Sequence, residues 1–130
     1  MLKVSKEFTF DSAHKLENIY KDDAWNLKTY GKCNHIHGHT YKLVVTVAGD
    51  PNPDTGMLVN FVTLKEVVTK NIIRTMDHKF LNTVFPHGTI TTCENMLKYF
   101  WNMLVIDLPN LYEINLWETP TSYASMQRDI

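Results

Sequence analysis

Two stretches of alternating residues constrain the fold of this chain more than any other feature. From Val4 to His14, one face carries Val4, Phe8, Phe10, Ser12 and His14. From about His37 to Gly49, one face carries His37, His39, Tyr41, Leu43, Val45 and Val47. A period of two is typical of a half-buried β-strand, because successive side chains point to opposite faces of a sheet. Both stretches are therefore predicted as strands, each with histidine at one end.

The hydrophobic period changes after a turn-rich segment at residues 50–56. Phe61, Leu64, Val68 and Ile72 recur at the spacing of an amphipathic helix, which Asn60 is placed to cap. Thr91-Thr92-Cys93-Glu94 fits a capping box that opens a second helix. The apolar face of this helix carries Leu97, Phe100, Trp101, Leu104 and Leu108. We expect Phe61, Phe100 and Trp101 to lie in the core.

Alternation returns near the end of the chain, at Tyr112, Ile114, Leu116 and Glu118, and a last short strand is expected from Thr121 to Met126. Residues 15–34 and 77–89 show no clean period and are expected to be irregular. The order ββααββ predicts an α+β domain, with two helices on one face of a four-stranded antiparallel sheet.

Composition narrows the functional class. A chain of 130 residues and 15.1 kDa is one domain, residues 1–130, with 44% hydrophobic and 21% charged residues. A net charge of −1 gives no broad basic surface for nucleic acid, and no apolar run reaches membrane-spanning length. The N-terminus has no apolar signal core, which predicts a cytoplasmic protein. The two cysteines, Cys33 and Cys93, are expected to be reduced thiols.

Histidine is the residue type that points to chemistry. His37 and His39 project from the same face of the predicted second strand, and His14 ends the first. If these strands pair antiparallel, the three imidazoles converge and leave a fourth position open, which is the arrangement of a catalytic zinc site. His35 is expected to be a bystander and His87 an exposed loop residue.

Other polar residues leave alternatives open at this stage. Cys33 could be a fourth zinc ligand, which closes the site and makes it structural, or a thiolate base beside the metal. Asp77 and His78 could be a pair at a helix C-terminus, and Glu94 a plain capping residue. Glu118 is more telling, because a carboxylate in phase with apolar residues is costly unless it has a partner. Cys93 is most simply an inert residue at a helix start.

Five segments resemble the 6-pyruvoyl-tetrahydropterin synthase family in the family's order. They are Phe10-Asp11-Ser12-Ala13-His14, Cys33-Asn34-His35-Ile36-His37-Gly38-His39, Met76-Asp77-His78-Lys79-Phe80-Leu81-Asn82, Thr92-Cys93-Glu94-Asn95 and Glu118-Thr119-Pro120-Thr121-Ser122. The Cys-x-x-x-His-Gly-His spacing and the Glu-Thr-x-Thr-Ser ending look most like the bacterial branch, which makes 6-carboxy-5,6,7,8-tetrahydropterin. The resemblance covers nearly the whole chain.

The resemblance implies a role for each matching position. It implies zinc ligands at His14, His37 and His39, and a catalytic triad of Cys33, Asp77 and His78. It implies that Glu118 anchors the pterin ring and that Glu94 contributes to the pterin pocket. It also implies the tunnelling fold, a homo-oligomer that is typically a hexamer, with active sites at subunit interfaces and the Asp-His pair supplied by a neighbour.

The substrate implied by the resemblance is 7,8-dihydroneopterin triphosphate. In the bacterial branch it loses triphosphate and a two-carbon aldehyde, in a pathway to queuosine and other 7-deazapurines. The rival activity of the family eliminates triphosphate but keeps the three-carbon side chain as a pyruvoyl group. A hypothesis of another class is a non-catalytic zinc scaffold with Cys33 as fourth ligand. Lys15, Lys28, Lys32 and Lys79 are candidates to hold the triphosphate by charge and position only.

Overall fold

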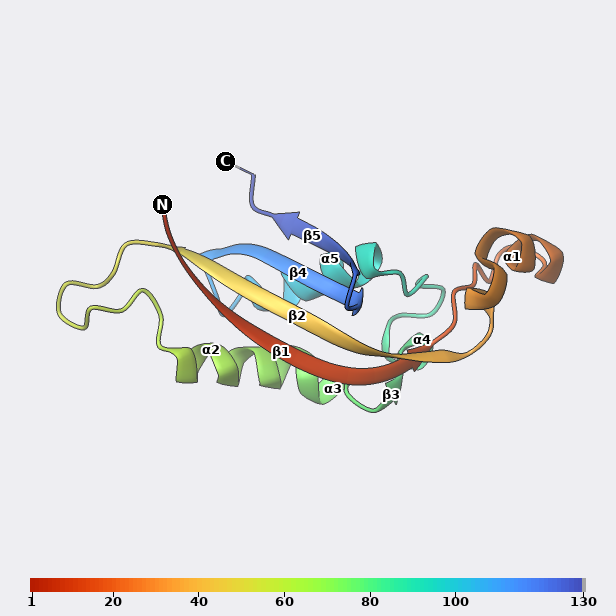
Figure 1. The fold of residues 1–130 in the computed structure, drawn as a ribbon, viewed down its shortest axis with the longest axis horizontal. Coiled ribbons are helices and arrows are strands. Elements are labelled where there is room, and N and C mark those ends of the chain that lie inside the picture. The colour runs from red at the N-terminus through yellow and green to blue at the C-terminus, as the bar shows by residue number, and fades with distance from the viewer. Residues whose placement is uncertain (130) are drawn as a thin grey trace.

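The computed structural model describes residues 1–129 and is built around two long, paired strands (Figure 1). β1 (Leu2–His14) and β2 (His37–Gly49) run antiparallel over their full length, with Leu2 opposite Gly49 and His14 opposite His37. β4 (Leu111–Thr119) pairs with β2, and β5 (Ser122–Gln127) pairs with β4, both antiparallel. The antiparallel sheet and its four predicted strands are confirmed.

A fifth strand extends the sheet beyond the prediction. β3 (Lys79–Phe80) pairs in parallel with β1 at Ser12 and Ala13, so the strand order is β3-β1-β2-β4-β5. The segment expected to be irregular from 77 to 89 therefore contains β3 and the short helix α4 (Leu81–Val84). A two-residue strand carries no readable alternation, which is why the sequence did not reveal it.

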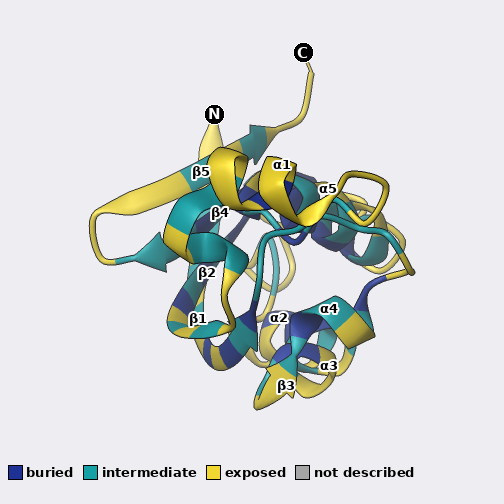
Figure 2. Ribbon diagram, turned by 90° about the vertical axis from the view of Figure 1, so that its right-hand side faces the viewer, coloured by how far each residue is buried: buried dark blue, intermediate teal, exposed yellow. Residues whose placement is uncertain are grey.

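The two predicted helices cover one face of the sheet (Figure 2). α2 (Phe61–Val68) begins at Asn60, whose side chain accepts a hydrogen bond from the backbone N–H of Val62. A π-helical turn, η2 (Thr69–Ile73), and α3 (Arg74–Met76) continue it. Leu64, Val68 and Ile72 are fully buried, but Phe61 is 54% exposed, so its expected place in the core is wrong. Phe61 is the first helical residue and lies beyond the end of the buried stripe.

α5 (Cys93–Leu104) supplies the other half of the core, and Phe100 at its centre is fully buried. The predicted capping box is wrong by one residue. Thr92, not Thr91, is the N-cap, and its hydroxyl accepts from the backbone N–H of Asn95 at 3.3 Å. The helix also stops at Leu104, although Leu108 beyond it is still buried in the core.

Residues 15–34, expected to be irregular, contain a helix instead. α1 (Asp23–Tyr30) is followed by the 3-10 turn η1 (Gly31–Asn34). Asp22 caps α1, and the buried Asn26 donates to the carbonyls of Asn18, Lys21 and Asp22. Polar contacts rather than an apolar face stabilise this helix, so its sequence has no hydrophobic period from which a helix could be predicted. Figure 1 places it at one end of the molecule, beyond the start of β2.

Within residues 1–129, the helices are all too short or too polar to cross a membrane.

Candidate metal and pterin site

The full pairing of β1 with β2 brings three histidines together. His14 is opposite His37 and Ser12 is opposite His39, and all three imidazoles lie on the helix-covered face of the sheet. The ring centroids of His14 and His37 are 4.6 Å apart, those of His37 and His39 are 4.9 Å apart, and those of His14 and His39 are 5.2 Å apart. The strand register thus produces the convergence that the sequence predicted.

Glu118 joins the three histidines from β4. One ligand atom from each of the four residues lies within 4.8 Å of the other three. Glu118 Oε1 is 2.7 Å from His39 Nε2 and 3.7 Å from His14 Nε2. The pKa of the Glu118 carboxyl lies below its ordinary value, chiefly because of the His14 imidazole, with His39 adding to the effect and burial opposing it. Glu118 is therefore an anion at neutral pH.

Backbone carbonyls fix how two of the imidazoles are oriented. His14 Nδ1 lies 2.9 Å from the Thr91 carbonyl oxygen and 3.1 Å from its hydroxyl. His37 Nδ1 lies 2.7 Å from the carbonyl oxygen of His35. A carbonyl only accepts, so both Nδ1 atoms carry the proton and both Nε2 atoms present a lone pair. The side chain of His35, expected to be a bystander, is exposed and lies outside the group of four, and only its backbone carbonyl contacts His37.

The donor set fits a zinc ion. The Nε2 atom of His37 is buried and makes no hydrogen bond within the described chain, and the Nε2 atom of His39 has the Glu118 carboxylate as its neighbour at 2.7 Å. Buried polar atoms without partners are rare in folded proteins. The pKa of His39 is lowered, chiefly by burial and further by the other two imidazoles, while the Glu118 carboxylate opposes the shift; the net effect favours the neutral form that binds a metal. Three neutral imidazoles are a known ligand set of catalytic zinc.

Tyr41 forms the floor beneath the histidines. Its side chain is fully buried, its ring stacks on Phe10 at 5.0 Å, and its hydroxyl is 3.4 Å from both ring nitrogens of His14. Burial and the Glu118 charge raise the pKa of Tyr41, so the phenol stays neutral. Sequence reasoning placed Tyr41 on the buried face but gave it no part in the site.

The pterin-pocket residues of the resemblance lie beside the histidines. Glu94 and Glu118 line a pocket of about 270 Å³ with Cys93, Ser122, Tyr123 and Ala124. Cys93 Sγ is 3.8 Å from Glu118 Oε2, and burial followed by the Glu118 charge raises the pKa of this thiol to about 12. Cys93 was expected to be inert, but it contacts the carboxylate that the sequence singled out.

Asp77 and His78 form a pair along the edge of β1, immediately before β3. Asp77 Oδ2 is 2.9 Å from His78 Nδ1, and Asp77 Oδ1 accepts from the backbone N–H of Asp11 at 2.9 Å. These two contacts, the backbone one foremost, lower the pKa of Asp77. His78 adopts a left-handed backbone with φ of 57°, and its N–H donates to the Asp11 carbonyl at 2.6 Å. His78 and His39 line one pocket of about 600 Å³.

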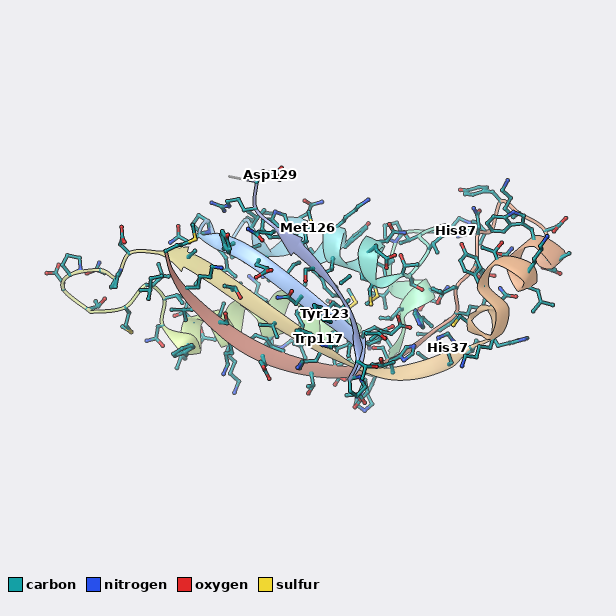
Figure 3. All side chains as sticks on the ribbon, turned by 45° about the horizontal axis from the view of Figure 1, so that its top comes forward. His37, His87, Trp117, Tyr123, Met126 and Asp129 are labelled. Carbon is teal, nitrogen blue, oxygen red and sulfur yellow. The ribbon has the colours of Figure 1, made fainter. Side chains whose placement is uncertain are left out.

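Cys33 stands apart from the group of four. It lies in η1, is partly buried, and its carbonyl accepts from the backbone N–H of Leu16 at 2.7 Å. The ligand atoms that cluster within 4.8 Å in the described residues form two groups, one of His14, His37, His39 and Glu118 and one of Asp11, Asp77 and His78, and neither includes the Cys33 sulfur. His87, expected to be an exposed loop residue, is exposed and lies away from His37 (Figure 3).

The fold and this site together define an α+β protein of the pterin synthase type. The family model described as 6-pyruvoyl tetrahydropterin synthase matches residues 3–129, and the chain belongs to that family. It is 38% identical over 123 residues to human 6-pyruvoyl tetrahydrobiopterin synthase, covering 90% of this chain and 85% of that protein. It is 34% identical over 150 aligned residues to the Haemophilus influenzae 6-carboxy-5,6,7,8-tetrahydropterin synthase, covering 98% and 99%.

A solved structure agrees with this assignment. The Caenorhabditis elegans 6-pyruvoyl tetrahydropterin synthase superposes with a TM-score of 0.92 at 28% identity, covering 98% of this chain and 96% of that one. A Wolinella succinogenes protein of 18% identity shares the fold with a TM-score of 0.75. The family and the fold that the sequence motifs predicted are therefore confirmed.

Proposed function

We propose that this chain is a zinc-dependent 6-carboxy-5,6,7,8-tetrahydropterin synthase. The reaction converts 7,8-dihydroneopterin triphosphate and water to 6-carboxytetrahydropterin, acetaldehyde and triphosphate. The observation that carries the proposal is the convergence of ligand atoms from His14, His37 and His39 beside the anionic Glu118, with the buried His37 Nε2 atom lacking a hydrogen-bond partner among the described residues. The end-to-end match to the Haemophilus influenzae protein of that name supports this branch of the family.

His14, His37 and His39 would hold the zinc through Nε2. Bound there, zinc supplies a Lewis acid that makes a coordinated hydroxyl group easier to deprotonate. Glu118 has its two oxygens in one plane, which suits the adjacent N–H donors of an aminopyrimidinone ring. Glu94, exposed on the rim of the same pocket, would contact the ring from the side of α5.

Cys33, Asp77 and His78 would move protons. A positioned thiolate can act as a general base, and that is the role proposed for Cys33. Asp77 accepts from His78 Nδ1, so the Nε2 atom of His78 is free to exchange a proton with the reacting carbon. His78 is 78% exposed in the single chain. We propose that a neighbouring copy in a homohexamer brings this pair to the zinc site, in a cytoplasmic enzyme of queuosine synthesis.

Product analysis tests the reaction. The zinc-loaded protein is incubated with dihydroneopterin triphosphate, and the products are separated by chromatography. Acetaldehyde in equal amount to a 6-carboxypterin is the expected result. A pyruvoyl product without acetaldehyde would instead support 6-pyruvoyl tetrahydropterin synthase, the second candidate, which is favoured by the 38% identity to the human protein of that name.

A Cys33→Ala variant tests the role of the thiol against the scaffold hypothesis. If Cys33 is a base, the variant keeps about one zinc per chain while turnover falls by about a thousandfold or more. Loss of zinc or of folding in this variant would show that Cys33 is a structural ligand. The separation of Cys33 from the cluster of four supports the first outcome.

A further inference from the structure

The sheet divides next to the zinc-site residues. Pairing between β2 and β4 begins at Lys42 and Trp117. Beyond that pair, β2 continues back to His37 and β4 continues forward to Thr119, without a ladder between them. A groove of about 580 Å³ occupies this fork, and its walls include His39, Thr40, Lys42, Trp117, Glu118 and Thr119. The groove therefore joins the metal site to the outer face of the sheet.

Lys42 is the single lysine or arginine on the described walls of this groove. Its Nζ lies 4.2 Å from the centroid of the Trp117 ring, a distance at which a cation is attracted to the aromatic face. Trp117 stacks in turn on Tyr123, with centroids 4.5 Å apart and ring planes 20° from parallel. Both side chains are labelled in Figure 3. The ammonium group is thus held in place by an aromatic support.

The charge of Lys42 is not neutralised by a carboxylate. Within residues 1–129, its Nζ has no acidic oxygen within 4.0 Å. Glu118 is the acidic residue on the groove wall, and its two oxygens face His39 and Cys93. The Thr40 hydroxyl, on the groove wall, donates to Asp11 Oδ1, whereas Thr119 lines the groove without a side-chain hydrogen bond to the described residues. An ammonium without a carboxylate partner is an arrangement that attracts phosphate oxygens.

Two of the lysines proposed from the sequence, Lys15 and Lys79, are less suited than Lys42 to binding an anion because of their contacts. Lys15 Nζ is 3.2 Å from a carboxylate oxygen of Glu17. Lys79 lines the neighbouring pocket together with Asp11, close to the Asp77–His78 pair. Lys15 is therefore paired with a carboxylate, and Lys79 shares its pocket with Asp11. Lys42 was missed because nothing in the sequence marks the point where β2 and β4 separate.

We propose that the groove at the fork binds the phosphate chain of the substrate, with Lys42 as its main cationic contact. This inference rests on the proposed function for the identity of the anion, a triphosphate ester. The groove leads away from Glu118, so a pterin ring at Glu118 and a side chain at the histidines would direct the phosphates toward Lys42.

Inorganic triphosphate is the probe, because it needs no turnover. Calorimetric titration of the zinc-loaded protein compares the wild type with Lys42→Met, Lys42→Arg and Lys3→Met. Lys3 is a matched control, since its Nζ lies 4.6 Å over the Tyr112 ring on the same sheet but away from the groove. We expect Lys42→Met to weaken binding about tenfold or more, and Lys42→Arg and Lys3→Met to stay within about twofold of the wild type.

Equal affinity of Lys42→Met and wild type, or no triphosphate binding by the wild type, would overturn the proposal. An equal loss of triphosphate affinity in Lys3→Met and Lys42→Met would also overturn the proposal, because it would indicate that binding depends on overall charge rather than on the groove. Thermal unfolding of each variant shows whether it is folded, and Lys42→Met keeps the apolar stem against Trp117. A wild type that binds triphosphate at Lys42 but yields no carboxypterin would contradict the proposed reaction and leave this site standing.

Discussion

Cys93 Sγ lies 3.8 Å from Glu118 Oε2, while the other carboxylate oxygen faces His39 at 2.7 Å. The thiol is 7% exposed and donates to the carboxylate from the first turn of α5. The two oxygens of Glu118 are thus held by different elements, which fixes the plane of the carboxylate. A fixed plane is needed for two parallel hydrogen bonds to a ring.

Replacing Cys93 separates hydrogen bonding from packing. Cys93→Ser keeps a donor and Cys93→Val keeps an apolar side chain, so we expect the serine variant to retain affinity for pterin. The valine variant is expected to lose about 1 kcal/mol, or roughly fivefold in Kd, when pterin binding is followed by fluorescence. If packing alone matters, the order of the two variants is reversed.

The reactivity of the two cysteines toward iodoacetamide is predicted to differ. Burial and Glu118 raise the pKa of Cys93 to about 12, so at pH 8 its thiol is almost wholly protonated and unreactive. Raising the pH toward 12 increases its thiolate fraction and its rate. Peptide mass mapping at pH 8 should find Cys33 modified first, and both cysteines equally modified in urea. Equal rates in the native protein would contradict the environment described for Cys93.

Adjacent threonines are predicted to have separable roles. The Thr91 hydroxyl contacts His14 Nδ1, whereas the Thr92 hydroxyl caps α5. Thr91→Val should weaken zinc binding by about tenfold, since groups behind a metal ligand typically contribute that much, and leave the cap intact. Thr92→Val should cost about 1 kcal/mol of unfolding free energy and leave zinc binding unchanged. Zinc competition with a chromophoric chelator and urea unfolding measure the two effects, and a shared response in both variants would argue against the separation.

The Asp77 carboxyl is predicted to make the free energy of unfolding depend on pH. Its carboxyl has a lowered pKa in the folded chain, because the Asp11 N–H and His78 contact the charged form. The stabilisation is therefore present at neutral pH and is lost as pH falls below the ordinary value of about 3.9 toward the lowered one. Asp77→Asn keeps an acceptor but removes the charge. The difference in urea midpoint between wild type and variant should shrink as pH falls from 7 to about 3, and a constant difference would refute the charge effect.

The sheet and the histidine cluster were predictable because both depend on a period of two. Alternation in residues 4–14 and 37–49 fixes which face each side chain occupies, and pairing then brings His14 beside His37. Glu118 was accessible to the same reasoning, because it is in phase with the buried Ile114 and Leu116. In a regular strand, the face occupied by one side chain fixes the face occupied by every other side chain of that strand.

Features that depend on single contacts were not predictable. The N-cap is Thr92 rather than Thr91, and the Thr91 hydroxyl contacts His14 instead. α1 is organised by the amide of Asn26, which leaves no hydrophobic period to read. The left-handed backbone of His78 depends on its bond to Asp11, 67 residues earlier in the chain. Such contacts require the tertiary structure to be known.

The complete register between β1 and β2 also has a consequence for how the protein acquires metal. A slip of one residue would turn His37 and His39 to the outer face and leave His14 alone. A zinc ion with affinity for three imidazoles would therefore bind only after the two strands have paired correctly. Metal binding would then stabilise the correctly paired β1 and β2 strands selectively, relative to pairings whose register is shifted by one residue.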